Sequence, residues 1–468
     1  MFWTITILLY VLLAFGIVAK LLINGMRPSK SLAWLLAIFT IPIGGILLYL
    51  MVGRNRRKNK LFTLKDDFTK NLPEPPRSKP TENVKQHRNL VNLIYGSCGY
   101  PLTCNNSVEI LRDGKATFDC IFNALETAKD HIHIQYYIFE DGELAERFFK
   151  ILETKRKEGV SIRVMYDSVG SFSLDESYKK RLNTIGVEVG QFLPFRLGKF
   201  ISSLNYRNHR KIVIIDNIIG FTGGINVSDK YLKEDTEIGS WQDTHMKIEG
   251  DAVNLLNRIF LTDWYLATEK EVKIPSNTLK KEIQHKIPLQ IVPSGPDDDF
   301  AVMEQVYFKI INNAKDYLYI VNPYIIPNHA ILQSLQTAAL SGVDVRLLIS
   351  ATTDYKMVDW CVRSYFESYL KSGIKVHLHP DAFIHSKIMV SDDKIASIGT
   401  ANLDNRSLQQ NYETNAIIYH EALSIQVKEQ FLKDCESAIR LSDFDAYHKR
   451  SKRKKLLEGA AKLLSPML

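Results

Sequence analysis

The sequence predicts an α/β protein: two similar α/β halves in a pseudo-twofold arrangement, preceded by an N-terminal transmembrane helical hairpin. Three observations predict this class. The pattern His-x-Lys-x4-Asp occurs twice, strand-like apolar runs alternate with helical stretches in both halves, and two apolar stretches open the chain. A chain of 468 residues is long enough for two or three domains.

The two opening apolar stretches run from Phe2 to about Ile23 and from Leu32 to Val52. Each is near the roughly 20 residues that a membrane-spanning helix needs. A cleaved signal peptide is the alternative, but the first stretch lacks a basic leader and an evident cleavage site. Residues 1–53 are therefore predicted to form two transmembrane helices. Five cations follow the second stretch, so the positive-inside rule places the rest of the chain in the cytoplasm.

Residues 54–103 are predicted to form a basic juxtamembrane linker. From Asn59 to about Asn89 the chain is polar and charged and contains four prolines, a composition typical of an extended segment. The five cysteines show no C-x2-C spacing, and their odd number argues against a complete disulfide framework. Reduced thiols that face the cytoplasm are the simplest expectation.

The rest of the chain contains an internal duplication. Four segments of residues 104–275, counting the His-x-Lys motif, recur in the same order within residues 276–448. The other three pairs are His131–Ile138 with Tyr317–Val321, Gly159–Val164 with Gly342–Leu347, and Gly186–Val189 with Gly373–Val376. Each half is expected to hold a central sheet, and the polar stretch from about Thr268 to Lys286 is the predicted joint.

The repeated motif supplies the candidate catalytic residues. They are His209, Lys211 and Asp216 in the first half, and His385, Lys387 and Asp392 in the second half. The His and Lys of each copy are two residues apart beside a strand-like run, so their side chains are expected on one face. Packing of the halves about a pseudo-twofold axis would bring both motifs together.

Residues of these types suit phosphoryl transfer. One neutral His can attack phosphorus, the other can protonate the leaving group, and the two Lys can hold the phosphate charge. No metal or other cofactor is required if the lysines supply that charge. Asp216 and Asp392 are open to two interpretations, since each can brace the turn after its strand or contact the substrate.

Two further matched pairs are expected to bind substrate or support the imidazoles. Asn226 and Asn402, each after a small-residue turn, are neutral donors for a phosphate. Asp243 and Glu413 stand in matched positions farther along and could each accept a proton from an imidazole Nδ1, or be surface carboxylates.

Other patterns fit less specific sites. His131 with His133, and His377 with His379, could bind a metal, but neither pair has a complete ligand set in the sequence. The apolar segment that contains Phe195 and Leu204 could receive acyl chains. Residues 449–468 are predicted to form a basic amphipathic segment suited to an anionic membrane surface, although a solvated tail is the alternative.

The chain resembles the phospholipase D superfamily, and within it the membrane-anchored bacterial cardiolipin synthases. The resemblance covers roughly Thr117 to Asp434. It is carried by Asn205-Tyr206-Arg207-Asn208-His209-Arg210-Lys211, Gly223-Gly224-Ile225-Asn226, Trp241-Gln242-Asp243-Thr244-His245, Pro293-Ser294-Gly295-Pro296 and Gly399-Thr400-Ala401-Asn402-Leu403-Asp404-Asn405-Arg406-Ser407.

This resemblance implies reversible phosphatidyl transfer between two phosphatidylglycerol molecules, giving cardiolipin and glycerol through a phosphohistidine, with His209 as nucleophile and His385 as acid and base. The symmetry of the motifs leaves the reverse assignment open. The alternatives are a phospholipase D-type hydrolase, a transferase that uses another headgroup alcohol, and an inactive membrane scaffold. The expected partners are phosphatidylglycerol and an anionic membrane surface, with no nucleic acid, at the bacterial cell membrane.

Overall fold

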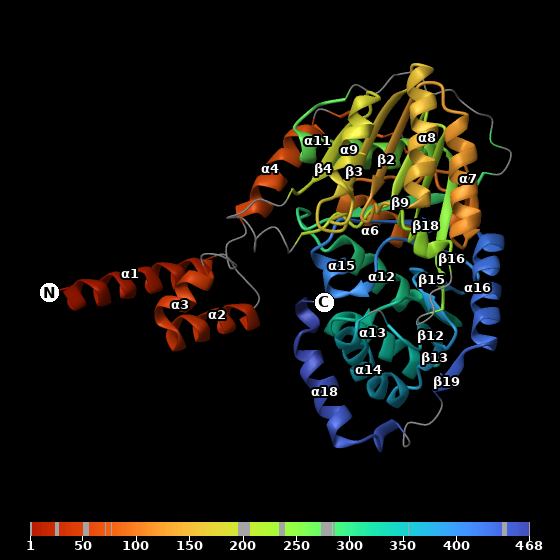
Figure 1. Cartoon of the computed structure of the whole chain (residues 1–468). Coiled ribbons are helices and arrows are strands. Elements are labelled where there is room, and N and C mark those ends of the chain that lie inside the picture. The colour runs from red at the N-terminus through yellow and green to blue at the C-terminus, as the bar shows by residue number, and fades with distance from the viewer. Residues whose placement is uncertain are drawn as a thin grey trace. The chain divides into compact units, whose positions relative to one another are not determined.

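The computed structural model describes residues 2–23, 28–49, 56–70, 72–75, 77–194, 206–233, 239–272, 283, 286–353, 355–441 and 447–467. The chain forms two compact units. The first unit is residues 1–64 with residues 195–205, and the second is residues 65–194 with residues 206–468. All of the sheets belong to the second unit (Figure 1).

The N-terminal helices differ from the expected hairpin. They are α1 (Phe2–Ile23), α2 (Pro28–Thr40) and α3 (Pro42–Leu48). The second expected span is broken at Pro42, which starts α3 because a proline lacks the N–H that would continue α2. Within the described ranges, none of the helices is both long enough and apolar enough to cross a bilayer.

The linker is only partly extended: residues 73–75 and 77–81 contain no helix or strand, but helices lie on both sides of them. It contains α4 (Arg56–Lys70), α5 (Glu82–Lys85) and α6 (Arg88–Cys98). Leu90, Val91 and Ile94 recur at helical spacing in α6 and are buried in the core of the second half. The composition of the linker was misleading because its apolar residues are few but regularly spaced.

The first half contains a seven-stranded sheet in the order β1-β8-β6-β5-β2-β3-β4. The strands β2, β3 and β4 are parallel, and the remaining neighbours are antiparallel. The strands are β1 (Asn106–Arg112), β2 (His131–Tyr136), β3 (Ser161–Asp167), β4 (Glu188–Phe192), β5 (Ile212–Ile215), β6 (Ile219–Gly223) and β8 (Thr244–Gly250). The helices are α7 (Gly114–Glu126), α8 (Glu143–Lys157), α9 (Glu176–Thr184), the short η2 (Asp229–Tyr231) and α11 (Asp251–Thr268).

The second half repeats this sheet as β9-β18-β16-β15-β10-β12-β13 and adds β19 at the edge. The strands are β9 (Leu289–Ser294), β10 (Tyr317–Val321), β12 (Asp344–Ser350), β13 (Lys375–His379), β15 (Ile388–Ser391), β16 (Ile395–Gly399), β18 (Glu413–Ile418) and β19 (Ile439–Leu441). The helices are α12 (Val302–Asn313), α13 (His329–Leu340), α14 (Lys356–Lys371), α15 (Asn405–Gln409), α16 (Glu421–Glu436), α18 (Lys452–Leu463) and η3 (Ser465–Met467). The matching strand order confirms two similar α/β halves.

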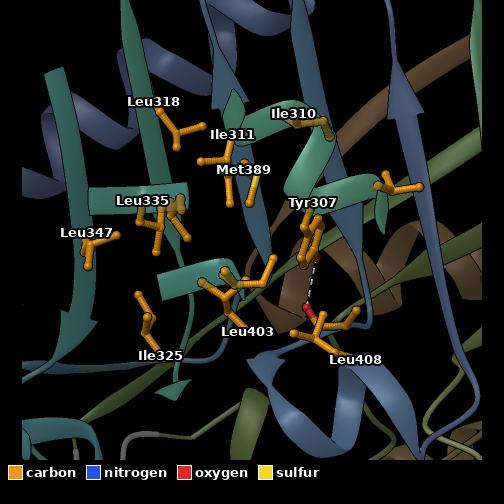
Figure 2. Close-up of a cluster of buried hydrophobic side chains, with 14 of the residues drawn as sticks. Tyr307, Ile310, Ile311, Leu318, Ile325, Leu335, Leu347, Met389, Leu403 and Leu408 are labelled. Atoms are coloured by element: carbon orange, nitrogen blue, oxygen red, sulfur yellow. Dashed lines mark hydrogen bonds between the residues drawn. The ribbon is translucent and has the colours of Figure 1, made fainter. Parts of the chain in front are cut away.

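The two halves contain three buried cores, of which the third holds the halves together. One core lies between the first sheet and α7, α8 and α9, and a second lies between the second sheet and α12, α13 and α14 (Figure 1). Figure 2 shows the second core, where the Tyr307 hydroxyl donates to the Ala401 carbonyl at 3.2 Å. The third core contains side chains of both sheets together with α11 and α16. Burial of this shared layer favours a fixed arrangement of the two halves.

Two short parallel pairings join the first half to the second, and a third lies within the second half. Strand β7 (Ser240–Gln242) of the first half pairs with β14 (Ala382–Ile384) of the second half. An isolated bridge likewise joins Asn208 to Tyr412. A further pair, β11 (Ile325–Ile326) with β17 (Leu403–Asp404), lies within the second half. The two crossing pairings place the segments before His209 and His385 against the opposite half. Most of the predicted joint, at residues 273–282 and 284–285, lies outside the described residues.

Candidate active site

His209 is held by the opposite half of the protein. Its backbone N–H donates to the Tyr412 carbonyl at 2.9 Å, and its Nδ1 lies 2.9 Å from Glu413 Oε2 and 3.1 Å from the Thr400 carbonyl. Since a carboxylate and a carbonyl both accept hydrogen bonds, Nδ1 must carry a proton. The other ring nitrogen, Nε2, is then the one with a lone pair.

His385 has the mirrored arrangement. Its backbone N–H donates to the Gln242 carbonyl at 2.7 Å, and its Nδ1 lies 2.7 Å from Asp243 Oδ2. The Tyr231 hydroxyl is 3.1 Å from the same Nδ1 and 3.5 Å from the same carboxylate oxygen. No hydrogen bond from the described residues reaches Nε2 of either imidazole. The carboxylate of each half therefore orients the imidazole of the other half.

Both carboxylates are buried, so the alternative of surface carboxylates is wrong. Their pKa values are shifted in opposite directions. Burial raises the pKa of Asp243 to about 6, against the opposing effect of Lys387. Burial also raises the pKa of Glu413, but His209 and Lys211 outweigh it and leave that pKa below its usual value. Glu413 is accordingly the more firmly ionised partner.

Burial favours the neutral form of both imidazoles. Burial lowers the pKa of His209, although Glu413 acts in the opposite direction. Burial lowers the pKa of His385 well below its usual range, and Lys387, Lys211 and His209 lower it further. The effect of His209 and Lys211 on His385 reflects the proximity of the two motifs, which the sequence could only predict.

Each motif lysine donates a hydrogen bond to the backbone carbonyl of the histidine in its own motif. Lys211 Nζ donates to the His209 carbonyl at 2.7 Å, and Lys387 donates to the His385 carbonyl. Burial, with Lys387 nearby, lowers the pKa of Lys211 well below its usual value despite Glu413. A phosphate anion would offset this loss of solvation, because opposite charge favours the ammonium form.

Asp216 and Asp392 lie at the far end of strands β5 and β15 from the imidazoles. The Asp216 carboxylate accepts from the backbone N–H groups of residues 129, 130 and 131, each at 2.8 Å. Asp392 accepts from residues 315, 316 and 317, each at 2.9 Å. Both residues have positive φ, near 53° and 54°. These contacts brace the turn that precedes β2 or β10, which is one of the two roles considered for these residues.

The two asparagines lie in unlike environments. Asn226 Oδ1 accepts from the Ile138 backbone N–H at 3.1 Å. Asn402 is 8% exposed, and its Oδ1 has no hydrogen-bond partner within the described part of the chain. Asn402 is therefore the better placed of the two to gain a contact when a ligand binds.

Sequence reasoning missed several residues around the imidazoles. Tyr231 contacts His385, and the Tyr137 ring meets the His209 ring edge at 4.8 Å between centroids. The Thr400 hydroxyl donates to Glu413 Oε2 at 2.6 Å. Thr400 belongs to a repeated turn and could have been found there, whereas Tyr231 lies outside every repeated segment.

The other predicted sites find less support. His133 Nδ1 contacts Asn257 Oδ1 at 2.7 Å and its Nε2 contacts Arg163 at 3.2 Å, so the first H-x-H pair is structural. Among the described residues, no three His, Cys, Asp or Glu side chains group as metal ligands. The apolar segment from Phe195 to Leu204 lies outside the described residues.

Comparisons with known proteins agree with this architecture. The family model described as "Cardiolipin synthase, PLD-like domain" matches residues 121–264 and 307–435, and "Phospholipase_D-nuclease N-terminal" matches residues 3–54. A cardiolipin synthase of Geobacillus sp. (strain WCH70) is 38% identical, over 94% of this chain and 89% of the relative. A cardiolipin synthase of Listeria monocytogenes serotype 4a is 36% identical, over 99% of this chain and 98% of the relative.

One solved structure has the same fold. It is the phosphatidylserine synthase of Haemophilus influenzae, which is 15% identical and has a TM-score of 0.61. The similarity covers 83% of this chain and 100% of that structure.

Proposed function

Because this chain belongs to the cardiolipin synthases of the phospholipase D superfamily, we propose that it transfers a phosphatidyl group between two phosphatidylglycerol molecules. The products are cardiolipin and glycerol. The observation that carries the proposal is the exchange of carboxylates, in which Glu413 orients His209 and Asp243 orients His385. Two imidazoles held in this way present two Nε2 atoms for opposite tasks at one phosphorus.

In the proposed reaction, the neutral His209 Nε2 attacks phosphorus and the bond to the glycerol headgroup breaks. His385, protonated when substrate binds, gives its Nε2 proton to the departing glycerol oxygen. The free hydroxyl of a second phosphatidylglycerol then loses its proton to His385 and attacks the phosphohistidine. Cardiolipin leaves, and His209 is neutral again. The resemblance supports this order, and the symmetric site also allows the reverse roles.

Charge stabilisation is assigned to the lysines and asparagines. Lys211 and Lys387 lie beside the imidazoles and would turn from the motif carbonyls to the nonbridging phosphate oxygens. Asn402 and Asn226 would add neutral hydrogen bonds. The lysines supply two positive charges, which suits an anionic diester.

We further infer that the protein works at the cytoplasmic face of the bacterial cell membrane. Helices α1 to α3 expose many large apolar side chains, among them Phe15 at 73% and Ile23 at 83%. Helix α18 packs on α14 and exposes Leu456 and Leu463 beside Lys452 and Arg453. Apolar and basic side chains on one face suit an anionic lipid surface.

The test is product analysis with purified full-length protein and phosphatidylglycerol that is labelled in the headgroup and, separately, in the acyl chains. We expect labelled cardiolipin and free glycerol in equal amounts. Phosphatidic acid as the main product would instead identify a hydrolase, and an added alcohol that outcompetes phosphatidylglycerol would identify another acceptor.

The matched variants are His209→Ala and His385→Ala, with His131→Ala as a control imidazole outside the site. Both site variants should lose cardiolipin formation, and the control should keep it. Protein denatured rapidly in detergent at mildly alkaline pH, where a phosphohistidine bond survives, should carry the phosphatidyl label on His209 in wild type. Retained synthesis in either site variant would contradict the proposed chemistry.

A further inference from the structure

Helix α4, the segment that joins the apolar N-terminal helices to the sheets, is anchored through Lys65. Its Nζ lies 2.5 Å from Asp298 Oδ1 and 3.6 Å from Asp297 Oδ1. The Lys65 side chain is 28% exposed, and those of Asp297 and Asp298 are 0% and 12% exposed. One turn later in α4, the Phe68 ring stacks on Tyr265 with 4.7 Å between centroids. An ion pair with so little solvent around it holds its geometry better than a surface pair.

The two carboxylates belong to a tight loop after β9. Asp298 Oδ2 accepts from the Gly295 backbone N–H at 2.7 Å, and the Asp298 N–H donates to the Gly295 carbonyl at 3.2 Å. Gly295 leaves no room for a side chain, since a Cβ there would lie 2.5 Å from Asp297 and 2.8 Å from Tyr412. The loop therefore presses directly on Tyr412, the residue whose carbonyl receives the His209 N–H.

Arg210 carries the contact from this loop to Glu413. Its guanidinium donates to the Ser294 carbonyl at 3.0 Å, to the Glu413 carbonyl at 3.0 Å and to Asp263 Oδ1 at 2.6 Å. Arg210 is 4% exposed. Since the Glu413 side chain orients His209, an unbroken series of contacts runs from Lys65 to an imidazole of the candidate active site.

We propose, on the premise of the function proposed above, that Lys65 is a positioning residue for His209 and couples helix α4 to catalysis. Lys65 offsets the charge of Asp297 and Asp298. The Arg210 guanidinium can then keep its hydrogen bonds to Asp263 and to the Ser294 and Glu413 carbonyls. Without Lys65, two buried carboxylates compete for Arg210, because an unpaired buried charge is costly. Arg210 then moves from Glu413, and His209 loses its fixed orientation.

The experiment compares Lys65→Met with Lys65→Arg and Lys70→Met in full-length protein assayed on phosphatidylglycerol micelles. Lys70 lies on the same helix and pairs with Asp66 in a solvent-exposed contact, which makes it the matched control. We expect Lys65→Met to lower kcat about 10-fold while KM changes little, because coupling of this kind acts on orientation. Lys65→Arg, which keeps the charge, should recover most of kcat, and Lys70→Met should match wild type.

A double variant separates positioning from simple misfolding. Lys65→Met with Asp298→Asn removes one of the competing carboxylates, so kcat should rise above that of Lys65→Met alone. An unchanged kcat in Lys65→Met, an equal loss in Lys70→Met, or no recovery in both Lys65→Arg and the double variant would overturn the proposal. The outcome of this experiment is independent of the His209→Ala test. That variant tests the proposed function, whereas the Lys65 variants test only how His209 is positioned.

Discussion

His209 and Glu413 are 204 residues apart in the chain, yet Nδ1 of the imidazole lies 2.9 Å from Oε2 of the carboxylate. The second half supplies the carboxylate that orients the imidazole of the first half. The reciprocal pair, His385 with Asp243, spans 142 residues and is 2.7 Å long. Because both pairs cross the boundary, the duplicated motif becomes one site with two differently tuned imidazoles.

Replacing either carboxylate should cripple catalysis. In Asp243→Asn and Glu413→Gln, the amide can donate to Nδ1 and favour the wrong tautomer, so we expect kcat to fall about 100-fold or more. Steady-state kinetics of cardiolipin formation measure this. Asp130→Asn is the control, since the exposed Asp130 carboxylate contacts His131 Nδ1 at 2.7 Å outside the candidate site. A loss below threefold in both site variants would contradict the orienting role.

The activity should have an acid limb that belongs to Asp243. The pKa of this carboxyl is raised to about 6 by burial, so it gains a proton as the pH falls through 6 and stops accepting from His385. The pKa of Glu413 is lowered, so Glu413 stays ionised there. We expect kcat/KM to decline below about pH 6 in wild type and in Glu413→Gln. The decline should disappear from the residual activity of Asp243→Asn, and its persistence there would assign the limb elsewhere.

Asp216 and Asp392 should matter for stability and not for turnover. Asparagine keeps the left-handed backbone but leaves one oxygen where the carboxylate has two, so Asp216→Asn should cost about 1–3 kcal/mol of stability. Thermal melting with a parallel kcat measurement tests this, with Asp392→Asn as the symmetric replicate. We expect kcat per folded molecule to stay within about twofold of wild type. A large loss of kcat without a change in melting temperature would restore these residues to the catalytic set.

His245 should make the protein sensitive to acid. It is fully buried, neither ring nitrogen has a hydrogen-bond partner within the described residues, and burial lowers its pKa from 6.5 to about 3. His245 therefore binds a proton below pH 6.5 in the unfolded chain but only near pH 3 in the folded chain. The free energy of unfolding decreases as the pH falls through this window. At pH 4.5 the loss is about 3 kcal/mol.

The variant that tests this is His245→Asn, which copies Asn415 at the matched position of the second half. Asn415 Oδ1 accepts from the Thr400 and Ala401 N–H groups, each at 3.1 Å. The difference in melting temperature between pH 7.5 and pH 4.5 should shrink in the variant. An unchanged difference would show that another group governs acid stability.

The duplication and the strands at His131, Ile212, Tyr317 and Ile388 could be predicted from sequence, since apolar runs and repeated motifs are local signals. The pairing of each imidazole with the opposite carboxylate could only be inferred as one of two alternatives, because its partners are far apart in the chain. Asp216 remained ambiguous for a related reason. Its role depends on three backbone N–H groups more than 80 residues away, which no sequence spacing records.

The linker shows a different limit. Prolines and charges predicted an extended segment, whereas helix α4 is stabilised by the contacts of Lys65 and Phe68 with residues far along the chain. Packing of this kind overrides local composition. The break at Pro42, in contrast, is a local signal that the sequence contains.

The bridge between Asn208 and Tyr412 and the β7–β14 pair have a genetic consequence. A gene cut between its two copies would yield fragments that each retain an imidazole but leave its brace on the other fragment. A substitution in one half that displaces its carboxylate also disturbs the imidazole of the other half. Selection on the shared site therefore keeps the two halves similar.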